Sequence, residues 1–154
     1  MSKKIFLAAP FKGLVNHDTS LLESGTKSKI TELIHFFEKR GHVVHNAHQR
    51  EAWGKEFMTP EQCTKIDYEE IKNCDIFVAF PGIPASPGTH IEIGWASAFK
   101  KKIVLLLFEN EEYYAYLVRG LHSVLDVKYI VYREKKDYLE ELDVFLKEMG
   151  ANEI

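Results

Sequence analysis

The stretch IFVAFPGIPASPGTHIEIGWA, residues 76–96, decides the fold because a buried strand, a loop and a helix follow one another in it. The run 76–80 is apolar without alternation, which is typical of a strand in a parallel sheet that helices cover on both faces. Two glycines and three prolines mark 81–88 as a loop that leads into a helix. Ser86, followed by proline, is the expected first residue of that helix, and Glu92 stands inside it among apolar or small neighbours.

The rest of the chain repeats this order of strand and helix. Four more short apolar runs predict strands, at 5–9, 42–45, 103–108 and 129–132. Four helical patterns accompany these strands. The first carries Ile30, Leu33, Ile34 and Phe37 and stops at Gly41, and the second opens with a capping box at Thr59 and runs to about Asn73. The third covers 86–101, and the last carries Leu139, Leu142, Phe145, Leu146 and Met149. This alternation predicts a doubly wound, Rossmann-like α/β fold with a parallel sheet of about five strands, formed by residues 1–154 as a single domain.

Composition excludes several classes of protein. The chain has 154 residues, of which 45% are hydrophobic and 28% charged, as in one compact globular domain. A net charge of -3, with both signs spread along the chain, argues against a binder of nucleic acid polymers. Cys63 and Cys74 lack the spacing of a zinc site or a disulfide framework. The first apolar run is too short for a signal peptide and no run is long enough for a membrane helix, so we expect a soluble, cytoplasmic protein without a membrane segment.

In a doubly wound sheet, ligands bind outside the carboxyl ends of the strands. This rule selects the loops 10–20, 46–58 and 81–87 as the expected ligand region. If Ser86 caps its helix, the amides of Gly88 and Thr89 point out of the helix start and form an anion site. The alternative is that Ser86 only caps the helix.

Two carboxylates are candidates for chemistry. The helix dipole favours the ionised form of Glu92, and an ionised carboxylate in a partly apolar pocket can attack an electrophilic carbon. The alternative is an exposed helix glutamate, the commonest position of that residue. Asp67 begins the acidic string DYEE, 67–70, which is otherwise explained as a solvated helix face.

Three histidines, His42, His45 and His48, invite comparison with a metal site. They straddle a strand and its exit, so alternate faces oppose convergence on one ion. We expect one of them, His45, to line a ligand pocket instead. No GxGxxG, P-loop, GxSxG or HExxH pattern is present, and the sequence therefore predicts no cofactor and no metal.

Four motifs together resemble the nucleoside 2-deoxyribosyltransferase superfamily. They are FLAAPFKG at 6–13, DYEEIKNCDIFVAF at 67–80, SPGTHIEIGWA at 86–96 and YLVRG at 116–120. The resemblance extends from residue 4 to about residue 148 in order and spacing. It implies that Glu92 is the nucleophile that attacks C1' of a nucleoside sugar, and that Asp67 helps to protonate or position the leaving base.

One position separates the branches of this superfamily. The transferases carry an aspartate six residues before the nucleophile, whereas this chain has Ser86, as the 2'-deoxynucleoside 5'-monophosphate N-hydrolases do. In those hydrolases the serine and the following amides hold the 5'-phosphate. The resemblance therefore implies that Ser86, Gly88 and Thr89 bind phosphate, together with Lys12 and Gly13 of the first loop.

Other positions depart from the family pattern or concern assembly. Phe6 replaces a tyrosine whose hydroxyl lies near the nucleophile, Ala9 and Pro10 replace a small polar pair, and Ala115 replaces a serine at the interface. These differences bear on base and phosphate specificity, and related pyrimidine ribonucleotide hydrolases, which accept a 2'-hydroxyl, share the same frame. Leu117 matches a segment at a dimer interface near the neighbour's site, so the resemblance implies a homodimer that contributes to substrate binding.

The sequence thus predicts hydrolysis of the N-glycosidic bond of a nucleoside 5'-monophosphate, which releases the base and (deoxy)ribose 5-phosphate. Base exchange by a nucleoside 2-deoxyribosyltransferase is one alternative. A nucleotide-binding or signalling module of related fold is another. A free acceptor base separates the first two, because only a transferase converts it into a new nucleoside.

Overall fold

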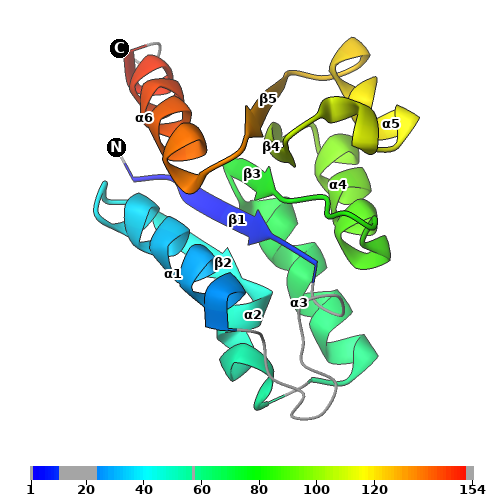
Figure 1. Cartoon of the computed structure of the whole chain (residues 1–154). Coiled ribbons are helices and arrows are strands. Elements are labelled where there is room, and N and C mark those ends of the chain that lie inside the picture. Colours follow the sequence, from blue (N-terminus) through cyan, green and yellow to red (C-terminus); the bar gives the residue numbers. More distant parts are fainter. Residues whose placement is uncertain (1, 11–23, 57, 152–154) are drawn as a thin grey trace.

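The computed structural model describes residues 2–10, 24–56 and 58–151 (Figure 1). Five parallel strands form one sheet in the order β2-β1-β3-β4-β5. They are β1 (Lys4–Ala8), β2 (Val43–Asn46), β3 (Ile76–Ala79), β4 (Lys102–Phe108) and β5 (Val127–Tyr132). The prediction of a doubly wound α/β fold with about five strands is confirmed.

Six helices connect and cover these strands. They are α1 (Ser24–Glu38), α2 (Ala47–Arg50), α3 (Pro60–Asn73), α4 (Pro87–Ala98), α5 (Tyr116–Arg119) and α6 (Lys135–Ala151), with single 3-10 turns at Ala52–Gly54, Glu111–Tyr113 and Leu121–Ser123 among the described residues. The four long helices are those that the sequence predicts. The short helices α2 and α5 are not predicted, because four residues are too few to show a helical period.

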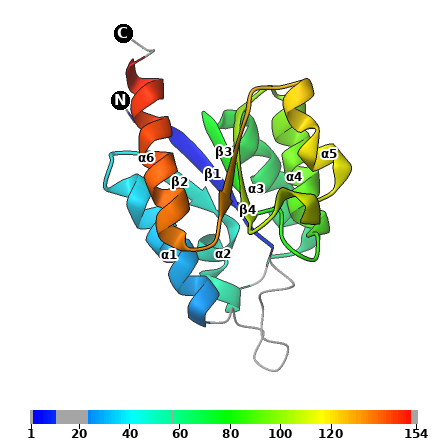
Figure 2. The ribbon, with the colours of Figure 1, turned by 45° about the horizontal axis from the view of Figure 1, so that its top comes forward.

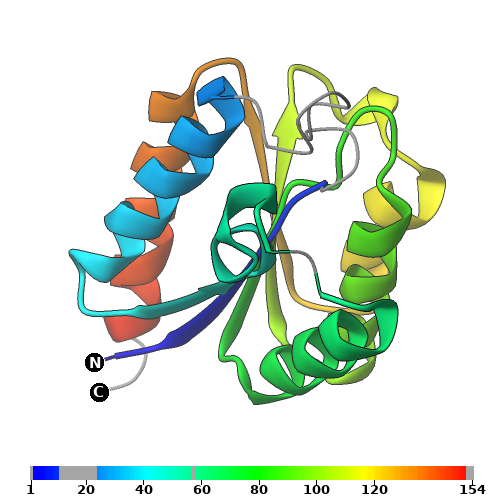
Figure 3. The ribbon, with the colours of Figure 1, turned by 90° about the horizontal axis from the view of Figure 1, so that it is seen from below.

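The helices lie in two layers around the sheet. Helices α1 and α6 cover one face, and α3, α4 and α5 cover the other (Figure 3). Ile5 and Leu7 of β1 point into the core beneath α1 and α6, whereas Phe6 and Ala8 point into the core beneath α3 and α4. Both faces of β1, β3 and β4 are buried, and the runs 5–8, 76–79 and 103–107 within them are therefore apolar without alternation.

Helix boundaries follow the expected chemistry. Thr59 and Gln62 form the complete capping box of α3. The chain turns away from α1 at Gly41 with φ of 84°, a left-handed conformation that glycine adopts without strain. Ser86 caps α4 and a proline follows it at the first helical position.

The strand order reverses at β1 and β3, which pair with each other through Ala8 and Ala79. From their neighbouring carboxyl ends the chain leaves toward opposite faces, the arrangement in which doubly wound proteins bind ligands. Gly82, in the loop after β3, has φ of 92°. A Cβ atom there would lie 2.5 Å from the side chain of Pro10. Glycine therefore lets this loop pack against the end of β1 and carry the start of α4 across the crevice.

Cys63 and Cys74 are both free thiols. Cys74 is buried in the core, and burial raises the pKa of its thiol to about 11. In the described part of the chain, no helix has the length and apolar character needed to cross a membrane.

Candidate active site

The two predicted catalytic carboxylates, Asp67 on α3 and Glu92 on α4, come together beside the crevice. The helices pair through aromatic rings, because Tyr68 packs edge-on against Trp95 and Phe99 with ring centroids 5.4 and 5.3 Å apart. Glu92 lies three residues before Trp95 and therefore on the same side of α4. Its carboxyl lies close enough to that of Asp67 for the two groups to influence each other's ionisation. Sequence reasoning singled out both residues, and the fold makes them a pair.

Glu92 is protonated in the empty site at neutral pH. Burial raises the pKa of its carboxyl, the charge and hydrogen bond of Asp67 raise it further, and Arg50 opposes them only in part, so that the pKa is about 9. The expectation that the helix dipole keeps Glu92 ionised is therefore wrong. Glu92 is the sixth residue of α4, beyond the first turn where the dipole is effective. It is partly buried rather than exposed.

Asp67 behaves in the opposite way. Burial alone would raise the pKa of its carboxyl, but the neighbouring His45 and the hydrogen bond and positive charge of Arg50 lower the pKa overall. Only 14% of the side chain is exposed, so Asp67 does not belong to a solvated helix face as the alternative held. Together the pair holds one proton near neutral pH, and in the empty site that proton is on Glu92.

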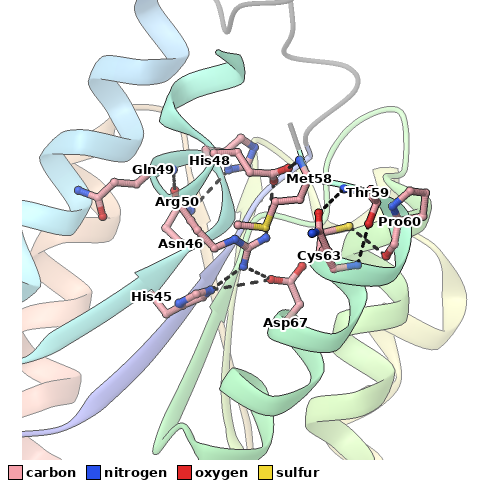
Figure 4. Close-up of polar contacts among 12 residues, drawn as sticks. His45, Asn46, His48, Gln49, Arg50, Met58, Thr59, Pro60, Cys63 and Asp67 are labelled. Carbon is pink, nitrogen blue, oxygen red and sulfur yellow. Dashed lines mark hydrogen bonds and ion pairs between the residues drawn. The ribbon is translucent and has the colours of Figure 1, made fainter. Parts of the chain in front are cut away.

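A buried arginine joins Asp67 to the end of β2. Nη1 of Arg50 donates to Oδ1 of Asp67 at 2.6 Å and to Nε2 of His45 at 2.9 Å (Figure 4). Nη2 lies 3.6 Å from Oε2 of Glu51. Sequence reasoning placed Arg50 in a ligand-region loop but gave it no role. Its position shortly after a strand, at the edge of the sheet where ligands bind, was the signal that could have indicated a role in the site.

His45 lies beside Asp67, with Nε2 of its ring 3.8 Å from Oδ1 of the carboxylate. Its ring stacks on Phe6 with centroids 5.3 Å apart and an angle of 25° between the planes. Phe6 stacks in turn on Phe77 at 5.7 Å and is only 1% exposed. Phe6 therefore supports His45 from below, and His45 covers the ring that stands where the superfamily has a tyrosine near the nucleophile.

The other two histidines have structural contacts elsewhere. His48 is buried, and Nε2 of its ring lies 3.2 Å from the carbonyl oxygen of Pro10. Burial lowers the pKa of His48 to about 4. Nδ1 of His42 accepts a hydrogen bond from the amide of Lys3. The three histidines do not converge, and across 2–10, 24–56 and 58–151 no three His, Cys, Asp or Glu residues are grouped to hold a metal ion.

The start of α4 supplies fewer free donors than the sequence predicts. Oγ of Ser86 accepts a hydrogen bond from the amide of Thr89 at 3.3 Å, and Thr89 is 2% exposed. The expectation that the Thr89 amide points outward is therefore wrong, because the cap uses it. Gly88 is exposed, and nothing lies within 4 Å of where its Cβ would be. Two donors of the predicted anion site remain available to a ligand, the amide of Gly88 and the hydroxyl hydrogen of Ser86. The Gly88 amide is available because amides in the first turn of a helix have no partner within the helix.

A cavity of about 510 Å³ lies on the other side of the loop that follows β3. Its lining comes from the end of β1, from α1, from the loop and from the ends of β4 and β5, and includes Lys29, Phe80, Ser86, Phe108 and Tyr132. Nζ of Lys29 donates to the Tyr132 hydroxyl at 2.7 Å. Neither carboxylate lines this cavity, and among the described residues of the predicted site Ser86 alone does.

Leu117 lies on α5 at the outer edge of the molecule, beside α4 (Figure 2). Its side chain is 86% exposed, and those of Tyr116 and Val124 are 84% and 75% exposed. We call these three residues the α5 patch. Lys12 and Gly13 lie outside the described residues.

One known protein family matches most of the chain. The profile of the family described as "Domain of unknown function (DUF4406)" matches residues 3–105. Among curated proteins none matches the chain.

Several solved structures are similar over nearly the whole chain. The CMP N-glycosidase BcmB of Clostridium botulinum is 50% identical, with a TM-score of 0.73 over 93% of this chain and 99% of that one. The solution structure of BlsM is 52% identical, with a TM-score of 0.79 over 92% of this chain and 87% of that one. A 2-deoxyribosyltransferase of Bacillus psychrosaccharolyticus is 21% identical, with a TM-score of 0.57 over 88% and 90%, and shares the fold. The named relatives among these include an N-glycosidase and a transferase, both enzymes.

Proposed function

Since the chain belongs to the nucleoside 2-deoxyribosyltransferase superfamily and to its N-hydrolase branch, we propose that it hydrolyses the N-glycosidic bond of a nucleoside 5'-monophosphate. The products are the free base and the sugar 5-phosphate. The observation that carries this proposal is the pairing of Glu92 with Asp67, which Arg50 contacts at 2.6 Å, because the pKa values of the two carboxyl groups are shifted in opposite directions. Such a pair supplies the two roles that a retaining glycosidase requires.

The first half of the proposed reaction forms a covalent intermediate. The proton passes from Glu92 to Asp67 within the pair, which leaves Glu92 as a carboxylate. Glu92 attacks C1', the bond between C1' and the base nitrogen breaks, and Asp67 gives its proton to the departing base. The result is a glycosyl ester on Glu92, an ionised Asp67 and a neutral base.

The second half restores the enzyme. Asp67 takes a proton from water, the hydroxide adds to C1', and the ester bond breaks so that Glu92 leaves as a carboxylate. The pair again holds one proton, now on Asp67, which returns to Glu92 when the product leaves. Two displacements at C1' retain the configuration of the sugar.

The substrate class follows from Ser86 and from the relatives. An uncharged Ser86 hydroxyl and the Gly88 amide at the start of α4 favour an anionic group such as the 5'-phosphate, together with Lys12 and Gly13. BcmB is a CMP N-glycosidase at 50% identity. We therefore propose a pyrimidine ribonucleotide, with cytidine 5'-monophosphate as the first substrate to test. The two unpaired cysteines fit a reducing compartment, and we propose that the enzyme acts in the cytoplasm.

The α5 patch supports a homodimer as the working form. Its three apolar side chains are more than two thirds exposed in a single chain, which is unusual for residues of their size unless a partner covers them. We propose that a second copy packs there and brings Leu117 to the neighbouring active site. The site of one chain is then complete only in the dimer.

The test is to incubate the purified protein with ribo- and deoxyribonucleoside monophosphates and to measure free base by chromatography. The proposal expects base and sugar phosphate in equal amounts from a pyrimidine ribonucleotide. Adding a second free base distinguishes base exchange, because a new nucleoside or nucleotide would mark a transferase. Ligand binding without any base release would favour a binding module.

A further inference from the structure

Arg50 is an almost wholly buried cation placed between two side chains of the proposed site. Its side chain is 14% exposed, like that of Asp67. It comes from the last residue of α2, whereas Asp67 comes from the second turn of α3. Figure 4 shows the guanidinium between His45 and Asp67, with contacts to both. The short helix α2 therefore serves to bring a positive charge to a carboxylate on another element.

Packing alone does not explain this arginine. Nε and Nη2 are buried, and neither has a hydrogen-bond partner among the described residues. A buried guanidinium with unpaired N–H groups is unfavourable for folding, and an apolar side chain of similar size would fill the same space without that cost. Of its two carboxylate contacts, the one to Asp67 at 2.6 Å is much shorter than the one to Glu51 at 3.6 Å.

The geometry assigns the compensating charge to Arg50 rather than to His45. A guanidinium cannot accept a hydrogen bond, so Nε2 of His45 accepts from Arg50 at 2.9 Å. The ring proton is then on Nδ1, which faces Oε2 of Glu70 at 3.9 Å. Nε2 is 3.8 Å from Asp67, too far for a hydrogen bond. In this arrangement His45 is neutral and Arg50 is the cation in contact with Asp67.

We propose that Arg50 is a positioning residue that assigns the single proton of the carboxylate pair, holding Asp67 ionised and leaving the proton on Glu92 while the site is empty. An ion pair at this distance with little exposure to water favours the charged form of the carboxylate strongly. Two neighbouring carboxylates cannot both ionise readily, so fixing one ionised fixes the proton on the other.

This assignment deepens the proposed function and rests on it for its catalytic consequence. The resting arrangement is unreactive because a protonated Glu92 is a poor nucleophile. For reaction, the O–H bond of Glu92 breaks and an O–H bond forms on Asp67, against the preference set by Arg50. Once there, the proton is on an acid that Arg50 has made stronger, which favours its transfer to the departing base.

Other ionisable groups around Arg50 contribute to the same field. His45 lies on β2, His48 and Glu51 flank Arg50 in the chain, and Glu70 faces His45 from α3. His48 has a pKa lowered by burial and is neutral at the pH of interest. Since all four remain in place when Arg50 alone is replaced, their contributions cancel in the comparison.

The test uses carbon-13 NMR titration of the carboxyl groups in the intact, empty protein. Asp67→Asn and Glu92→Gln assign the two signals, and Arg50→Met and Arg50→Lys are compared with the parent. In Arg50→Met we expect the midpoint of Asp67 to rise by about 1 pH unit or more and that of Glu92 to rise as well, with smaller changes in Arg50→Lys. Arg40→Met is the control, because Arg40 pairs with Asp143 on the exposed side of α1.

Unchanged midpoints in a folded Arg50→Met protein would overturn the assignment, and so would midpoints that rise equally in Arg40→Met. If Arg50→Met does not fold, the Asp67 midpoint in Arg50→Lys decides, with no rise counting against Arg50. The titration needs no turnover. A protein without base release that shows the shift refutes the proposed function and keeps the assignment, whereas base release without the shift refutes the assignment alone.

Discussion

Asp67 on α3 and Glu92 on α4 are neighbouring carboxyl groups, and the pKa of the first is lowered while that of the second is raised to about 9. Two carboxyl groups in contact would ordinarily compete for ionisation on similar terms. Here their pKa values differ, because burial raises that of Glu92 whereas Arg50 contacts Asp67 directly and lowers that of Asp67. Groups separated in this way can act as acid and base, or acid and nucleophile, at one pH.

Replacing Asp67 by asparagine is expected to change Glu92 as well as the rate. The pKa of Glu92 should fall, because the charge and hydrogen bond of Asp67 raise it. Base release should slow by about 100-fold or more, since the departing base loses its proton donor. Both are measured on one sample, by carboxyl titration and by chromatography of free base.

The matched control for this change is Asp143→Asn, an aspartate of α6 that pairs with Arg40. It should leave the titration of Glu92 and the rate as they are. A Glu92 midpoint that stays in place in Asp67→Asn would contradict the coupling of the two carboxylates.

The pH dependence of stability offers a second prediction. The pKa of Glu92 is raised in the folded state from an ordinary value of 4.5 to about 9. The folded state therefore holds a proton that the unfolded state has lost, and the contribution to stability is full below about 4.5 and is lost as the pH rises toward 9. Glu92→Gln should remove this loss, and so gain at least about 1 kcal/mol over the parent between about pH 5 and about pH 8. Urea denaturation of both proteins at about pH 5 and about pH 8 measures this difference in the free energy of unfolding. The exposed glutamate of α6 in Glu141→Gln serves as control, and an equal gain there would contradict the prediction.

Ser86 provides a test of phosphate recognition. Both aspartate and asparagine cap helices well, so Ser86→Asp and Ser86→Asn should keep α4 intact. The aspartate adds a negative charge at the proposed phosphate site, and we expect kcat/KM for a nucleoside monophosphate to fall by about 100-fold relative to the asparagine variant. The corresponding nucleoside, which has no phosphate, should distinguish the variants by far less. Equal losses on both compounds would indicate that Ser86 does not face the phosphate.

The proposed dimer depends on the α5 patch. Leu117→Asp places a charge on a side chain that is 86% exposed in one chain, so it should leave the fold intact and disrupt a second copy packed there. Light scattering should report a dimer for the parent and a monomer for the variant, with base release reduced accordingly. Val144→Asp on α6 is the matched control, at 55% exposure and away from the patch. A parent protein that is monomeric at the concentration of the activity assay would rule out the dimer.

Most of the fold could be predicted from the sequence because it depends on local patterns. Unalternating apolar runs predict buried parallel strands, and capping residues such as Thr59 and Ser86 predict where helices begin. The short helices α2 and α5 could not be predicted, since neither contains a full helical period.

The sequence was sufficient to predict which carboxylates form the site, but not which of them is protonated. Asp67 and Glu92 were both recognisable from sequence. Their contact depends on how α3 packs on α4, which spacing within either helix does not determine. For the same reason the protonation of Glu92 was predicted wrongly, because burial and a carboxylate 25 positions earlier in the chain outweigh the dipole of its own helix. Arg50 has a role only through contacts made across three elements.

A covalent bond between Glu92 and the sugar should form during turnover, and peptide mass spectrometry after an acid quench detects it. The parent is mixed with cytidine 5'-monophosphate, quenched in acid and digested, and Glu92→Gln is treated alike. We expect a sugar phosphate attached to the peptide that contains Glu92 in the parent, and neither adduct nor base release in the variant. Base release by Glu92→Gln within a few-fold of the parent would contradict it.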